Sequence, residues 1–79
     1  MRVAGADLCP GTVADLATRL SHAGHTALAM RVGNAVDLNR DELHLTRADR
    51  GIVLRLLKAE CPDALRVLRD RLQAAYASS

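Results

Sequence analysis

Two of the three histidines and both cysteines are the residues of this chain whose chemistry and positions suit a metal ion or a nucleophilic site. His22 and His25 are spaced i, i+3, which places both imidazoles on one side of a continuous helix. A structural zinc site needs four ligands, and its cysteines and histidines usually come in closely spaced pairs. Cys9 and Cys61 belong to no CxxC motif, and Gly24 interrupts the helix between the histidines. The pattern therefore favours polar residues at a helix end, and we predict no bound metal and no cofactor.

The cysteines also have the positions that nucleophiles occupy in some enzymes. Each precedes a proline at the expected start of a helix, at Cys9-Pro10 and at Cys61-Pro62. The positive end of a helix dipole favours the thiolate, which is a physical argument for mild reactivity. A nucleophilic site also needs a base, and no histidine is tied by sequence to either cysteine. The acidic residues show no pairing suited to acid–base catalysis. We therefore predict that the protein is not an enzyme and has no catalytic residue.

The length and composition of the chain limit what its core can be. The 79 residues are expected to form a single small helical domain, near the lower end of what one core stabilises alone. Tyr76 is the only aromatic residue, so the core must consist of aliphatic side chains. These bury less area each than aromatic ones, and we expect modest monomer stability or self-association. No segment approaches the ~18 consecutive apolar residues of a membrane span. No long apolar run follows Arg2, and we expect a cytoplasmic protein with reduced thiols.

The spacing of apolar residues predicts a mainly α fold with four short helices in two helical hairpins. The first helix should follow Pro10 and end at Gly24 in a left-handed cap, and the second should span about 26–36. The third should begin at Thr46, with Asp49 at the position of a capping box, and the fourth should begin at 61–63. The residues predicted to be buried are Val13, Leu16, Leu20, Val32, Ile52, Val53, Leu56, Leu65, Leu68 and Leu72.

One short segment between the hairpins alternates as a strand does. In residues 42–45 polar and apolar side chains alternate, so Leu43 and Leu45 point the same way. Four residues cannot form an independent strand. The other extended candidate is residues 2–6, and we predict a minimal two-stranded patch that pairs 2–6 with 42–45.

Residues 14–36 have the order of a helix-turn-helix, with two helices and a glycine-containing turn. Such a motif reads bases with polar side chains near the start of its second helix. Only His25 and Thr26 lie there, while Arg31 and Asn34 lie further along. With a net charge of +2, the electrostatic footprint is weak and favours a plain helical hairpin. DNA binding through these four residues is the alternative function.

The second half of the chain carries more basic than acidic residues, but its aromatic content is low. The cations that would form a patch across the third and fourth helices are Arg55, Lys58, Arg66, Arg69 and Arg71. No aromatic residue interleaves them, so a stacking platform for single-stranded nucleic acid is not expected. A solvated face explains these charges, with Asp70 offsetting Arg66 at i+4.

Residues 43–72, LHLTRADRGIVLRLLKAECPDALRVLRDRL, combine leucine, threonine, an acidic–Arg pair, a helix rich in Ile and Leu, a proline and then Leu-xx-Leu-Arg. This run resembles small uncharacterised proteins of high-GC actinobacteria. The resemblance covers under half of the chain. It implies a cytoplasmic protein of a bacterium or phage, and it supplies no activity, cofactor or catalytic residue.

Apolar residues outside the predicted core indicate the preferred function. Leu54 and Val67 lie off the core stripes of their helices and, with Met30, are the candidates for an exposed apolar interface. We therefore expect non-enzymatic protein–protein interaction, in a small regulatory or adaptor module that binds a protein partner or forms a homodimer.

Overall fold

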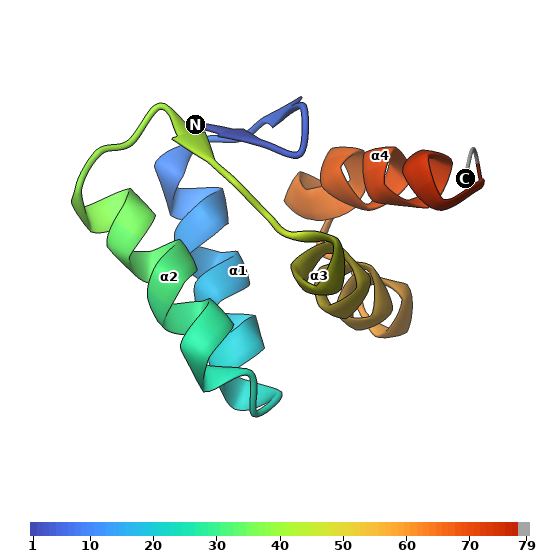
Figure 1. The fold of residues 1–79 in the computed structure, drawn as a ribbon, viewed down its shortest axis with the longest axis horizontal. Coiled ribbons are helices and arrows are strands. Elements are labelled where there is room, and N and C mark those ends of the chain that lie inside the picture. Colours follow the sequence, from blue (N-terminus) through green and yellow to red (C-terminus); the bar gives the residue numbers. More distant parts are fainter. Residues whose placement is uncertain (78–79) are drawn as a thin grey trace.

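The computed structural model describes residues 1–77, which form four α-helices and a small three-stranded sheet (Figure 1). The mainly helical prediction is confirmed, and α1 and α2 lie side by side as a hairpin. Within the described residues, no helix combines the length and apolar character that crossing a membrane requires. The elements in chain order are β1 (Arg2–Val3), β2 (Ala6–Asp7), α1 (Pro10–His22), α2 (Thr26–Asp37), β3 (Glu42–Leu43), α3 (Arg47–Ala59), the 3₁₀ turn η1 (Asp63–Leu65) and α4 (Arg66–Ala77).

The first hairpin follows the sequence pattern closely. α1 begins at Pro10, where a proline loses no helical hydrogen bond. Its stripe Val13, Leu16 and Leu20 is fully buried against α2. Gly24 has a φ of 91°, which a side chain rarely tolerates, and its turn reverses the chain into α2. Local capping and periodicity therefore account for this half of the fold.

The sheet confirms the predicted pairing but contains a strand that the prediction missed. β1 lies in the middle, and it pairs in parallel with β3, Arg2 opposite Glu42 and Val3 opposite Leu43. Residues 2–6 are not one strand. The chain turns back at Ala4 and Gly5, which have φ values of 48° and 84°, and β2 then pairs antiparallel with β1. Two consecutive positive φ angles are typical of a tight hairpin turn, which the sequence pattern does not mark strongly here.

At the start of α3, the predicted capping box is present. The Thr46 hydroxyl accepts a hydrogen bond from the Asp49 amide at 3.1 Å, and the Asp49 carboxylate accepts one from the Thr46 amide at 3.0 Å. This exchange satisfies two amides that the first helical turn would leave without a partner.

The buried face of α3 is rotated from the predicted one. Ile52 and Leu56 are only half-buried, and Leu54, which we expected to be exposed, is buried with 7% of its surface accessible. α3 packs against α4, and Leu54 lines the same surface hollow as Tyr76 of α4, so the side of α3 that carries Leu54 faces that helix. The remaining predicted core residues are buried as expected: Val13, Leu16, Leu20, Val32, Val53, Leu65, Leu68 and Leu72.

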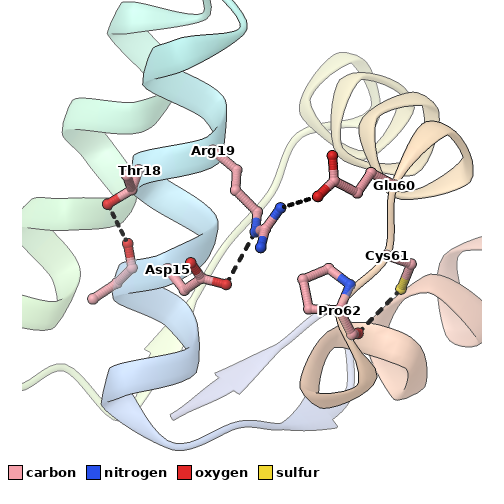
Figure 2. A network of polar contacts seen from close by, with 7 residues as sticks. Asp15, Thr18, Arg19, Glu60, Cys61 and Pro62 are labelled. Carbon is pink, nitrogen blue, oxygen red and sulfur yellow. Dashed lines mark hydrogen bonds and ion pairs between the residues drawn. The ribbon is translucent and has the colours of Figure 1, made fainter.

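The chain turns between α3 and α4 at Cys61 and Pro62, and an arginine from the first hairpin binds next to this turn (Figure 2). Arg19 on α1 pairs with Asp15 at 3.0 Å and with Glu60, just after α3, at 3.1 Å. The Cys61 thiol donates to the carbonyl oxygen of Pro62 at 3.4 Å. Because the carboxylates of Asp15 and Glu60 are exposed, these ion pairs contribute little to the stability of the fold.

Candidate functional site: a basic groove around Tyr76

Tyr76, in the last turn of α4, lies over a glycine of α3. Its hydroxyl group is 3.5 Å from the carbonyl oxygen of Arg47, to which it donates. A Cβ atom placed on Gly51 would be 2.8 Å from the Tyr76 hydroxyl, closer than real Cβ contacts allow. Glycine inside a helix costs about 1 kcal/mol relative to alanine. The close approach of Tyr76 therefore gives a packing reason for Gly51 in the middle of α3.

Two surface hollows flank the Tyr76 side chain. The first encloses about 260 Å³ and the second about 300 Å³, and Tyr76 lines both. We call the combined surface the Tyr76 groove. The first hollow is lined by Arg47, Arg50, Leu72, Ala75 and Tyr76, and the second by Gly51, Leu54, Arg55, Lys58 and Tyr76. Aliphatic side chains and cations therefore share a concave surface.

Among the described residues, no carboxylate pairs with the cations of the Tyr76 groove. Arg47, Arg50, Arg55 and Lys58 form no ion pair with any residue from 1 to 77, and no acidic residue lines either hollow. The chain has 11 basic and 9 acidic residues. Four of the basic residues line the groove, so the rest of the molecule holds seven basic residues and all nine acidic ones. The positive charge of the molecule is thus concentrated at this groove, which favours an anionic partner.

The groove differs from the basic patch that the sequence suggested. Arg66 pairs with Asp63 at 2.8 Å and Arg69 with Asp70 at 3.1 Å, so the expected Arg66–Asp70 pairing is wrong. In the structure, Arg55 and Lys58 line the Tyr76 groove together with Arg47 and Arg50 of α3. The arginines of α4 do not line it. Tyr76 lies among these cations although no aromatic residue interleaves them in the sequence. A glycine within the amphipathic α3 and a single aromatic residue were the signals that sequence reasoning missed.

Arg31, a candidate DNA contact, is held in an ion pair with a buried carboxylate. Its guanidinium donates to both carboxylate oxygens of Asp49, at 2.7 and 2.9 Å. Hydrogen bonding from Arg31 lowers the pKa of Asp49 from its ordinary 3.8 to about 2. The other candidates lie along α2: His25 is half-buried just before the helix, and Thr26 and Asn34 are exposed. Arg31 is therefore the only arginine among the four candidates, and its guanidinium is directed toward α3.

The apolar interface candidates do not form one surface. Leu54 belongs to the core and to the floor of the Tyr76 groove, so its predicted exposure is wrong. Met30 and Val67 are exposed, at 62% and 56%, as expected. They lie on α2 and α4, which are at opposite sides of the view in Figure 1. Isolated exposed apolar residues are normal on protein surfaces, so neither defines a site alone.

The remaining residues with reactive side chains lie apart. Cys9 and Cys61 are free thiols, exposed and half-buried respectively. The Cys9 sulfur is 3.0 Å from the Thr12 hydroxyl, and this hydrogen bond lowers the pKa of the thiol. His22 is exposed at the end of α1. Across residues 1–77, no three His, Cys, Asp or Glu side chains gather in a way that could hold a metal ion.

Comparison of the chain with protein-family models, curated proteins and solved structures finds no match. The chemistry of the Tyr76 groove is therefore the basis for proposing a function.

Proposed function

We propose that the protein is a non-enzymatic binding module, acting as a small regulator or adaptor, that recognises a protein partner through the Tyr76 groove. The observation that carries this proposal is a set of four cations, none of them ion-paired to any residue from 1 to 77, around an aliphatic floor. Carboxylates elsewhere in the chain pair with Arg19, Arg31, Arg66 and Arg69. A surface whose cations have no carboxylate partner in the described part of the chain is suited to an external anion.

The residue types of the groove support a protein partner. Arginine and tyrosine are enriched among the residues that contribute most to protein–protein binding. Three exposed cationic side chains of the groove lie on α3: Arg47, Arg55 and Lys58. Because they belong to one helix, their spacing is fixed. An apolar floor contributes burial, while the cations contribute specificity and faster association. We propose a reducing compartment such as the cytoplasm, in keeping with the two free thiols.

DNA binding by residues 14–36 has weaker support. Arg31 would have to leave the buried carboxylate of Asp49 to reach a base or a phosphate. Leaving that carboxylate without its partner is unfavourable. The exposed side chains of Thr26 and Asn34 carry no charge, and phosphate contacts dominate the affinity of DNA-binding proteins.

The proposal is tested by affinity capture from the native host with three immobilised proteins. These are the wild type, Arg55→Glu in the groove, and Arg40→Glu in the loop before β3. Both arginines are exposed and lack a carboxylate partner within residues 1–77, so the two variants make the same change in net charge. We expect one protein to bind the wild type and Arg40→Glu but not Arg55→Glu.

Sedimentation equilibrium of the purified chain distinguishes a homodimer from a complex with another protein. A dimer that Arg55→Glu dissociates would assign the groove to a second copy. Salt-sensitive recovery of DNA that is unaffected by Arg55→Glu would contradict the proposal and favour residues 14–36. Capture of the same proteins by all three baits would also contradict it.

A further inference from the structure

We infer that the Tyr76 groove binds an extended acidic segment of its partner, in which two carboxylates four residues apart flank an apolar side chain. This inference rests on the proposed function, because it identifies the chemistry of the partner at the same groove. It follows from the spacing of the cations, from the position of Tyr76 between them and from the aliphatic floor.

The cations of the groove form two pairs along α3. Arg47 and Arg50 line one hollow, and Arg55 and Lys58 line the other. The centres of these pairs are about eight residues apart, which corresponds to roughly 12 Å along a helix axis. An extended peptide advances about 3.3 Å per residue, so residues i and i+4 are roughly 13 Å apart. Two carboxylates at this spacing reach both pairs at once.

The residue between the two carboxylates meets the aliphatic part of the groove. In an extended chain, the side chains at i, i+2 and i+4 point to the same side. The side chain at i+2 therefore faces the region of Tyr76, which separates the two hollows and is 42% exposed. Leu54, Leu72 and Ala75 line the hollows beside it. An aliphatic side chain at i+2 gains burial there, whereas a polar one does not.

The same features favour a peptide over single-stranded nucleic acid. Proteins that bind single strands stack successive bases on several aromatic side chains. Here the chain has one aromatic residue, and the hydroxyl end of that residue is anchored over Gly51. Guanidinium groups bind carboxylates and phosphates alike with two parallel hydrogen bonds, so the single aromatic residue is the feature that favours a peptide.

Tyrosine fluorescence provides a direct test, because Tyr76 is the only aromatic residue of the chain. The probe is the acetylated and amidated peptide Ser-Glu-Thr-Leu-Thr-Glu-Ser, which contains no aromatic residue. Three further ligands accompany it: the same peptide with both Glu replaced by Gln, the same peptide with Leu replaced by Ser, and an oligothymidylate. We expect the probe to change the fluorescence saturably, and each altered peptide to bind at least about tenfold more weakly.

Variants of the protein locate the binding. Arg55→Glu should weaken the probe at least about tenfold, while Arg40→Glu should leave its affinity within about twofold. Circular dichroism of both variants confirms that the helices are retained. Equal binding of the Gln-containing peptide, or equal loss in both variants, would overturn the inference.

The test separates this inference from the proposed function. If a captured protein depends on Arg55 but the probe does not bind, the proposed function stands and the acidic-segment inference is overturned. If oligothymidylate binds more tightly than the probe and loses affinity steeply with salt, both are overturned.

Discussion

The guanidinium of Arg31 on α2 forms a two-point ion pair with the carboxylate of Asp49 on α3, with nitrogen–oxygen distances of 2.7 and 2.9 Å. The same carboxylate accepts the amide of Thr46 and so belongs to the capping box of α3. Only 7% of the Asp49 side chain is exposed. One buried carboxylate therefore both starts α3 and holds it against the first hairpin.

This ion pair makes the stability of the protein depend on pH. Asp49 has a pKa near 3.8 when unpaired and about 2 in the folded protein. A lowered pKa means that the stabilisation is complete above about pH 4 and is lost as the pH falls to about 2. We expect wild type to exceed Asp49→Asn in unfolding free energy by about 1–2 kcal/mol at pH 7, a value reduced for the exposure of Arg31. Urea unfolding at several pH values should show this difference shrinking between pH 4 and pH 2. A difference that stays constant over this range would contradict the assignment.

Removing Arg31 should destabilise the fold whether or not DNA is present. Arg31→Ala leaves the Asp49 carboxylate buried without its charged partner, which we expect to cost about 1–3 kcal/mol. Asn34→Ala, at an exposed position of the same helix, is the control and should change stability by less than about 0.5 kcal/mol. Thermal unfolding of both variants measures the effect. Equal melting temperatures for Arg31→Ala and wild type would contradict a structural role for Arg31. The side chain would then be free to contact DNA.

Features that depend on a few neighbouring residues were predictable from the sequence. The Thr46–Asp49 capping box and the positive φ of Gly24 were both found as expected. Each is determined by hydrogen bonds within one helix turn, so nearby residue types suffice to identify it. The buried stripes of α1 and α4 were also predictable, since amphipathic periodicity reflects which side of a helix faces the core.

Features that depend on how helices pack against one another were not predictable. Leu54 is buried and lines a hollow beside Tyr76 of α4, and Tyr76 lies among the cations of α3 because its hydroxyl end rests over Gly51. The pairing of Arg31 with Asp49 joins residues 18 positions apart on different hairpins. Periodicity identifies the buried face of a helix only approximately, and it does not specify the angle at which another helix crosses it.

The rotated face of α3 leads to a comparison of adjacent leucines. Leu57 is 1% exposed, whereas Leu56 is half-buried at the edge of the core. We expect Leu57→Ala to cost about 2–5 kcal/mol, since it leaves a cavity among well-packed neighbours. Leu56→Ala should cost about 1 kcal/mol, because less apolar surface is lost from the interior. Chemical unfolding of both variants checks the order, and a larger loss for Leu56→Ala would show that the face of α3 is misassigned.

The two thiols should differ in reactivity. Cys9 is exposed, and its hydrogen bond with Thr12 lowers the pKa of the thiol, which increases the thiolate fraction at neutral pH. Cys61 is half-buried and donates to a carbonyl oxygen. We expect iodoacetamide to modify Cys9 several times faster than Cys61 at pH 7.5, as followed by peptide mass spectrometry. Thr12→Val should slow the reaction of Cys9 and leave that of Cys61 unchanged. Equal rates in the wild type would contradict this account.

The contact between Tyr76 and Gly51 is tested by placing a methyl group beneath the phenol. Gly51→Ala gains about 1 kcal/mol in helix propensity, but its Cβ would approach the Tyr76 hydroxyl to 2.8 Å, so the tyrosine must move. Gly33→Ala in α2 is the control, because a Cβ there has no neighbour within 4 Å. We expect Gly33→Ala to stabilise the protein by up to about 1 kcal/mol and Gly51→Ala to stabilise it by less. Because Tyr76 is the only aromatic residue, its fluorescence should change in Gly51→Ala and remain that of the wild type in Gly33→Ala. Equal stabilisation by the two substitutions, with unchanged fluorescence in both, would show that Tyr76 does not rest on Gly51. In that case Tyr76 would not separate the two hollows of the groove.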